Sequence, residues 1–478
     1  MYMLLLCGAL ALLPFSHSFS PVVMRQIGTH LDRQPCFRPF HLLKVGLPTS
    51  SSKLHSALAS PSLPLPPSLS LSKPLKQEIA AGVTVGVTSL ASSITFALIV
   101  GINPLSGIWT SIIVGTIASL TGGRPGLISG AAGAVTVLLA SLVRAHGISY
   151  LFPVLMTVSL FELAFSYFSL SRVFLPVVSH NINCGFLNGL GFLLLKSQLG
   201  VFTPLKNEFL ASAVFVAVLT SAVSKILPKY NKNIPPVIAG VGTSTIVSSL
   251  FDLPVSTLGD VAGKATFAGG LSALPKLALP SASLLPDLAS YQGVVLPAAF
   301  SIALVSVLQT ILATKVLQEA SGNSDECTDN DRTILGLSLG NAASVLFGGI
   351  GGCGLIPLST LNVQAGGRQY ASSFTYAAAV ALSVMLFAPL IAMIPIASLA
   401  GVMIVVSLST VQWKWSLASF KDAFPSKRTS ALKIREKAKF AVLLATSYAC
   451  FFVDMGAGVG VGIGLSMLAN KLIGEEKQ

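Results

Sequence analysis

Long apolar runs dominate the chain from residue 79 onward, and short stretches of charged residues, proline and glycine separate them. Runs such as residues 79–101 and 374–394 are long enough to cross a hydrocarbon core of about 30 Å as helices. The period-two alternation that marks a membrane β-barrel is absent, and only helices or closed barrels can span lipid. The pattern therefore predicts an all-α polytopic membrane protein.

The interruptions divide these runs into about fourteen predicted transmembrane segments. The segments cover residues 79–99, 105–120, 129–143, 150–169, 175–195, 209–226, 235–251, 294–317, 333–348, 354–364, 372–388, 391–408, 438–453 and 456–472. The third and the tenth are short and broken, and one lies in each half of the chain, in residues 79–251 and 294–472. Broken segments at equivalent places predict an inverted repeat of about seven plus seven segments.

The two broken segments share one device, which is glycine and proline placed directly before a short helix. In the tenth, Gly351, Gly352 and Gly354 permit an extended backbone, and Pro357 suits the first turn of a helix. In the third, residues 121–133 (TGGRPGLISGAAG) repeat the arrangement. Irregular backbone at membrane depth is tolerated only where protein encloses it or water reaches it. We therefore expect two half-helices that meet at the bilayer midplane.

Two facing helix N-termini would form an anion site. Each carries free N–H donors and about half a positive charge, so the pair supplies on the order of one positive charge. That charge balances a monoanion but leaves a dianion such as sulfate under-compensated. The alternative is that the glycines only allow close helix packing, which is common in membranes.

Composition and charge agree with a membrane protein. The chain is 53% hydrophobic and 10% charged, with a mean hydropathy of +0.78. Its net charge of +13 lies largely in short connections between apolar segments, which the positive-inside rule explains without a nucleic-acid partner. The six cysteines show no CxxC spacing, and we see neither HExxH nor a GxSxG serine with a histidine partner. We therefore predict no metal, no cofactor and no enzyme activity.

The first 74 residues differ from the rest of the chain. Residues 1–19 form a signal-peptide-like apolar stretch, and residues 20–74 are rich in Ser, Pro and basic residues, like a transit peptide. The segment SHSFSP (16–21) resembles the presequences of proteins sent to the complex plastids of algae. We expect a plastid envelope or another plastid membrane, and the alternatives are a disordered cytosolic tail on a plasma-membrane or endomembrane protein.

Four stretches resemble the SulP family of anion transporters. They are ITFALIVGINPLSGIWTSI (94–112), GGRPGLISGAAGA (122–134), CGFLNGLG (184–191) and the long stretch 331–368. The resemblance implies a SulP-like transporter domain over residues 75–478, with a core domain (helices 1–4 and 8–11) that moves past a gate domain (5–7 and 12–14) in an elevator motion. It also implies a homodimer. The cytoplasmic STAS domain is expected to be absent, because the chain ends just after the last segment.

The resemblance also implies a substrate site built from the first, third, eighth and tenth helices. The predicted substrate-binding residues are Ser92, Phe96, Ser129, Gly130, Ala132, Gly133, Gln309, Cys353, Gly354, Leu358, Ser359 and Thr360. Na⁺-binding relatives carry Thr, Asp and Thr where this chain has Ala132, Gln309 and Ala313, and proton-coupled relatives keep an acid at the position of Gln309. Because Ala132, Gln309 and Ala313 carry no carboxylate, we expect no sodium coupling at the usual site. Animal exchangers place an arginine at the position of Leu358.

Each of two polar residues inside the predicted segments allows two interpretations. Gln309 could donate its amide to a bound anion or join an interhelical hydrogen bond. Glu162 is a candidate proton relay, since an acid within the membrane is a functional hypothesis by default, but it could also lie near an interface. The sequence predicts a secondary transporter or exchanger of small inorganic anions in a lipid bilayer, most simply bicarbonate or another monoanion. The alternative is a sulfate transporter, proton-coupled or exchanging.

Overall fold

A computed structural model describes residues 73–172, 179–203, 207–230, 235–267, 290–321, 328–423 and 430–473, with a few single positions between 269 and 287. The predicted segment 1–19 and nearly all of the predicted segment 20–74 lie outside the described residues. Everything below concerns the unit that begins at Leu71.

The described part of the chain is mostly helical. Its first half contains α3 (Lys73–Val100), α4 (Pro104–Thr121), β1 (Ser129–Ala131), α5 (Gly133–His146), α6 (Leu151–Tyr167), α8 (His180–Phe202), α9 (Asn207–Tyr230) and α10 (Pro236–Leu250). Two short elements follow, α11 (Leu258–Ala262) and the 3-10 helix η3 (Lys264–Phe267). The second half contains the π-helix η6 (Tyr291–Val295), α13 (Leu296–Ser321), α14 (Asn330–Leu346), β2 (Gly352–Gly354), α15 (Ile356–Gln364), α16 (Tyr370–Ala392), α17 (Ile396–Thr410), α18 (Trp413–Ala423), α19 (Ser430–Phe452) and α20 (Met455–Ile473).

Eight of the described helices are long and apolar enough to cross a membrane. Every predicted apolar segment overlaps a helix, so the prediction of a polytopic helical protein is confirmed. The predicted boundary between 372–388 and 391–408 was wrong, because α16 continues through Pro389 to Ala392. Helix α18 was not predicted, since Lys414 and Lys421 lower the mean hydropathy of its sequence.

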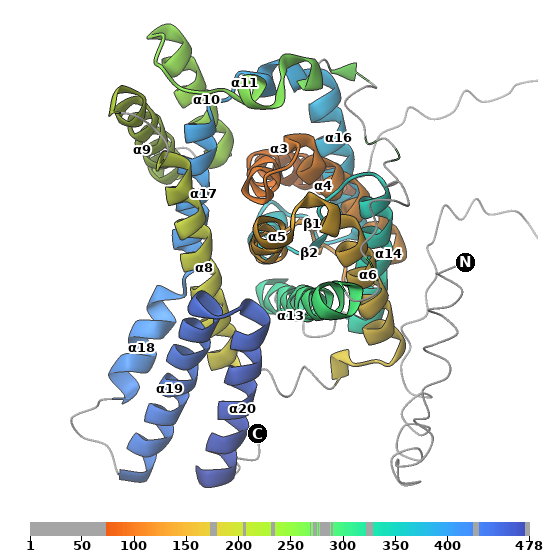
Figure 1. The fold of residues 1–478 in the computed structure, drawn as a ribbon, viewed down its shortest axis with the longest axis vertical. Helices are drawn as coiled ribbons and strands as arrows, with labels where there is room; N and C mark the ends of the chain where they lie inside the picture. Colours follow the sequence, from red (N-terminus) through yellow and green to blue (C-terminus); the bar gives the residue numbers. More distant parts are fainter. Residues whose placement is uncertain are drawn as a thin grey trace, which may run out of the picture. The chain divides into compact units, whose positions relative to one another are not determined.

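The helices pack into two bundles (Figure 1). The first, which we call the strand bundle, contains α3 to α6, α13 to α16 and both strands, and the second contains α8 to α10, α17, α19 and α20. Small residues bring the backbones together in both: a Cβ on Gly86 of α3 would lie 2.8 Å from Ala379 of α16, and one on Gly189 of α8 would lie 2.5 Å from Cys450 of α19. Such contacts are typical of helix packing in membranes.

Two of the connections between the bundles are joined to each other. The chain that follows α10 and the turn between α16 and α17 form one antiparallel bridge between Thr257 and Pro395. The Leu258 N–H donates to the Ile394 carbonyl and the Ile396 N–H donates to the Ser256 carbonyl, each at 3.0 Å. Backbone hydrogen bonds therefore hold both crossings at one place.

Candidate functional site

The two broken segments meet as a pair of short antiparallel strands. Gly130 at the centre of β1 pairs with Cys353 at the centre of β2, and all the residues of both strands are buried. Close approach requires glycine here, because a Cβ on Gly352 would overlap the carbonyl oxygen of Gly130. Ser129 and Gly130 were expected to open a helix and instead lie in a strand, since their backbone groups pair with the second strand rather than along a helix.

Side chains from four helices hold the ends of this strand pair. From α4, Thr110 accepts the Ile350 N–H at 2.8 Å. From α13, Thr310 accepts the Gly354 N–H at 2.9 Å. The α14 and α15 contacts have the same character: Asn341 Oδ1 accepts the Gly352 N–H at 2.8 Å, and Ser359 Oγ accepts the Ile128 N–H at 3.0 Å. These bonds offset the cost of burying backbone donors outside regular helix.

A helix begins directly after each strand, and neither has a side-chain cap. Helix α5 starts at Gly133 after Ala132, and α15 starts at Ile356 after Leu355, with Pro357 in its first turn. The strands are antiparallel, so the two helices leave the strand pair at opposite ends. The free N–H groups of both first turns therefore face back toward the strand pair and give it positive potential.

Most of the predicted site residues lie around this strand pair. Ala132, Gly133, Cys353 and Gly354 belong to the strands or the helix starts that follow them. Of the predicted residues on α13, Ala313 is the one nearest Gly354, 3.3 Å from where a Cβ on that glycine would lie. Phe96 of α3 reaches the same region, since a Cβ on Gly133 would meet its ring at 3.2 Å. Leu194 of α8, which was not predicted, lies beside Gly133 at 3.0 Å by the same measure.

Three of the predicted hydroxyl groups are bound within the protein. Ser92 donates to the Ser89 carbonyl at 2.9 Å, and Thr360 donates to the Ile356 carbonyl at 2.9 Å. Ser359 is buried and holds Ile128. Leu358, which lies one position before Ser359, is half-buried in the first turn of α15. The backbone donors and Gln309 are therefore among the polar groups left to face a ligand.

Gln309 carries a polar atom without a partner. Its side chain is buried on α13, next to Thr310, and its Oε1 makes no hydrogen bond to any part of the chain that the structure describes. An interhelical hydrogen bond through this oxygen is therefore not formed. A buried amide in this state favours contact with something outside the chain, such as water or a substrate.

Ser306, Thr310 and Asn341 were missed as functional positions. Thr310 supports β2, and Ser306 Oγ lies 2.6 Å from the buried carboxylate of Glu162. Glu162 itself is fully buried inside the protein. Among the described residues no group of His, Cys, Asp and Glu side chains could hold a metal ion.

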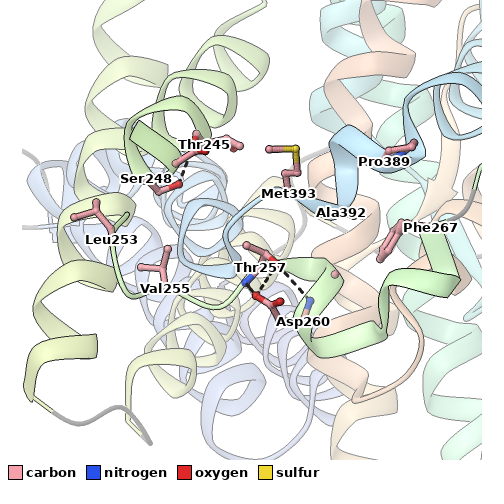
Figure 2. A pocket seen from close by; sticks show the side chains of 12 residues that line it. Thr245, Ser248, Leu253, Val255, Thr257, Asp260, Phe267, Pro389, Ala392 and Met393 are labelled. Atoms are coloured by element: carbon pink, nitrogen blue, oxygen red, sulfur yellow. Dashed lines mark hydrogen bonds between the residues drawn. The ribbon is translucent and has the colours of Figure 1, made fainter. Parts of the chain in front are cut away.

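A separate cavity of about 440 Å³ lies away from the strand pair, beside the bridged connections (Figure 2). Thr245 and Ser248 of α10, Thr257 and Asp260, and Met393 at the end of α16 contribute to its lining. Asp260 and Thr257 bond to each other as a cap of α11. No predicted site residue lines this cavity, and an exposed carboxylate at its edge does not favour an anion.

The sequence profile of the sulfate permease family matches residues 75–253 and 208–423 of this chain. The chain belongs to the sulfate permease family. The resemblance to SulP transporters is thereby confirmed. The family consists of transporters of inorganic anions, so this member is a multi-pass anion transporter and not an enzyme.

Known relatives of this sulfate permease family member are named for two different substrates, sulfate and bicarbonate. The chain is 28% identical to the putative sulfate transporter YbaR of Bacillus subtilis over 351 residues, 73% of this chain and 69% of the relative. It is 27% identical to the bicarbonate transporter BicA of a Picosynechococcus species over 433 residues, 84% of this chain and 72% of the relative.

Solved structures share the fold of this family member. The transmembrane domain of a cyanobacterial bicarbonate transporter BicA has 25% sequence identity and a TM-score of 0.66, covering 81% of this chain and 98% of that one. The murine Solute Carrier 26 family member A9 anion transporter, in an inward-facing state, has 15% identity and a TM-score of 0.65, covering 94% of this chain and 75% of that one.

Proposed function

We propose that this protein is a secondary transporter or exchanger of small monoanions, with bicarbonate as the first candidate. The observation that carries the proposal is the antiparallel pairing of β1 with β2, each followed by an uncapped helix N-terminus. The anion would lie between the first turns of α5 and α15 and accept their backbone N–H groups. Gln309 and the ring of Phe96 would complete the site.

The charge of this site favours monoanions. Two helix ends supply on the order of one positive charge. The two strands and the first turns of α5 and α15 contain no lysine or arginine, and Leu358 stands in the first turn of α15. Sulfate would carry one uncompensated charge into a region of low dielectric, which costs free energy. The name of BicA agrees with this preference, whereas the name of YbaR supports the alternative of a sulfate transporter, proton-coupled or exchanging.

The proposed transport motion is an elevator movement of the strand bundle past the second bundle. In this proposal the chain has fourteen segments in a seven-plus-seven repeat, with α5 and α15 as half-helices that meet at the bilayer midplane. The bundles meet at the site through contacts such as that of Gly133 with Leu194. The bridge between Thr257 and Pro395 would then act as a pivot where the chain crosses between bundles.

The setting of the protein is also part of the proposal. We propose a homodimer in a plastid membrane, with residues 1–19 and 20–74 as a targeting presequence and residues 75–478 as the transporter domain. The composition of the first 74 residues supports this placement. Imaging of a fluorescent fusion to the full chain, with and without residues 1–74, tests the location.

We predict that transport does not depend on sodium. Ala132, Gln309 and Ala313 offer no carboxylate, and hard cations in proteins prefer oxygen ligands that include one. The measurement is labelled bicarbonate uptake by the purified protein in vesicles, with sodium or potassium as the only alkali cation. Equal rates are expected. Uptake that stops in potassium would contradict this part of the proposal, and uptake of sulfate in preference to bicarbonate would favour the alternative.

We also predict that Gln309→Leu weakens anion binding. The substitution keeps the volume of the side chain and removes its amide, so loss of one hydrogen bond to a charged ligand is expected to cost about 1.5–3 kcal/mol, or about a tenfold to hundredfold rise in the half-saturating concentration. Thr116→Val on α4 is the matched control, because Thr116 bonds only to its own helix at 2.6 Å. Unchanged uptake by the Gln309 variant would remove this residue from the site.

A further inference from the structure

Glu162 is a buried acid that the proposed anion site does not use. It lies on α6, is fully buried, and has no ion-pair partner among the described residues. Its carboxylate accepts a hydrogen bond from Ser306 Oγ of α13 at 2.6 Å. It also accepts hydrogen bonds from Asn341 Nδ2 of α14, at 3.1 Å to one oxygen and 2.9 Å to the other. An ionised carboxyl placed here must offset the loss of its hydration with these donors alone.

The same two donors also reach the anion site. Asn341 Nδ2 lies 3.0 Å from the Gly352 carbonyl oxygen, and Ser306 Oγ lies 3.3 Å from it. Gly352 is the first residue of β2 and pairs with Ala131 at the end of β1. A single layer of side chains therefore separates the Glu162 carboxylate from the strand pair.

This cluster has fewer hydrogen-bond donor protons than close donor–acceptor contacts. The Asn341 amide has two protons and the Ser306 hydroxyl has one, which makes three. These three protons would have to serve five close contacts, three at the Glu162 oxygens and two at the Gly352 carbonyl oxygen. One further proton on Glu162 would let it donate to Ser306 Oγ, and the Ser306 hydroxyl would then donate to Gly352. Two hydrogen-bonding arrangements that differ by one proton thus share the same heavy-atom positions.

We propose that Glu162 binds a proton from the medium together with the transported anion and releases it on the other side of the membrane. The inference rests on the proposed anion site. An ionised Glu162 would oppose the positive potential of the two helix ends, and the neutral acid would not. Because linkage is reciprocal, a proton on Glu162 strengthens anion binding by the same factor by which the anion strengthens proton binding.

Other titratable groups on the neighbouring elements do not compete for this role. Cys353 of β2 is buried and within electrostatic reach of Glu162. On α13, Lys315 and Glu319 are exposed and lie two or more turns beyond Ser306. On α14, Asp331 and Arg332 lie in the first turn, about 15 Å along the helix from Asn341. On η6, the Tyr291 hydroxyl bonds to Thr157 at 2.6 Å. Tyr167 of α6 is exposed at the end of its helix.

The test uses labelled chloride as the probe, because chloride carries no proton of its own. Full-chain protein is reconstituted in vesicles that contain a pH-sensitive dye. We expect chloride uptake to acidify the vesicle interior, and the uptake rate at low chloride to rise by up to about tenfold for each pH unit that the medium is lowered, the limit for one linked proton. Glu162→Gln keeps the shape and cannot ionise, so it is expected to lose both the acidification and the pH slope.

Two further arms keep the result decisive. Glu208→Gln, an exposed acid at the start of α9, is the matched control and is expected to behave like the unmodified protein. Infrared difference spectra on chloride addition are expected to show the carbonyl band of a newly protonated carboxyl, and this band should be missing in Glu162→Gln even if that variant no longer transports.

Three outcomes separate the hypotheses. Chloride uptake that keeps its pH slope in Glu162→Gln overturns the inference, as does uptake by the unmodified protein with no pH slope and no infrared band. In both cases the proposed anion transport would stand. Failure of the unmodified, correctly assembled protein to move any of bicarbonate, chloride or sulfate at any pH would instead overturn the proposed function, and the inference with it.

Discussion

Replacement of Gly352 by alanine is expected to abolish anion transport. The added Cβ would overlap the carbonyl oxygen of Gly130, so β1 and β2 would have to move apart. Their separation would shift both helix N-termini of the proposed anion site, and a displacement of about 1 Å at such a site lowers a rate by about a hundredfold. Initial uptake of labelled bicarbonate into vesicles measures the effect.

A glycine elsewhere in the same chain provides the control for this substitution. Gly242 of α10 has open space where a Cβ would be added, so Gly242→Ala makes the same chemical change without a clash. We expect it to transport at the rate of the unmodified protein. Size-exclusion profiles and melting temperatures of both variants show whether a loss of transport follows a loss of fold. A correctly folded Gly352→Ala protein with normal uptake would show that the close strand pairing is not required.

Placing a positive charge at Leu358 is expected to change the preferred substrate. The first turn of α15 would then carry a full charge near the anion, and a unit charge at about 5 Å with an effective dielectric constant of about 20 contributes about 3 kcal/mol. A dianion gains twice as much as a monoanion. The rate ratio of sulfate to bicarbonate uptake is therefore expected to rise in Leu358→Arg, by up to about a hundredfold.

Leu358→Gln separates the effect of charge from the effect of polarity. Glutamine offers donors of similar reach without a net charge, so its sulfate to bicarbonate ratio is expected to stay near that of the unmodified protein. The ratio is measured in one vesicle preparation with both anions competing. An equal ratio in the arginine and glutamine variants would mean that the first turn of α15 does not face the substrate.

The positions of the two breaks could be predicted from the sequence because their signals are local. Gly123 and Gly351 adopt φ values of +110° and +68°, which favour glycine, and Pro357 lies in the first helical turn as expected. The apolar runs likewise located the helices, because length and hydropathy alone decide whether a segment can span lipid. These features need no information about the neighbours of a residue.

The contacts of the site could not be predicted because they join residues far apart in the chain. The pairing of Gly130 with Cys353 and the hydrogen bond from the Gly354 N–H to Thr310 Oγ1 depend on which helices become neighbours. A serine such as Ser306 looks the same in the sequence whether it bonds to its own helix or to the buried Glu162. Helix α18 was missed for a different reason, since its apolar and basic residues average to low hydropathy.

The most direct test of the account is a crystal structure of the protein grown with bromide, a monoanion whose anomalous scattering locates it without ambiguity. The account predicts one strong peak between the first turns of α5 and α15, within hydrogen-bonding distance of their backbone N–H groups and beside Gln309. A peak in the cavity next to Asp260, or none near the strand pair when transport is inhibited by the same bromide, would contradict it.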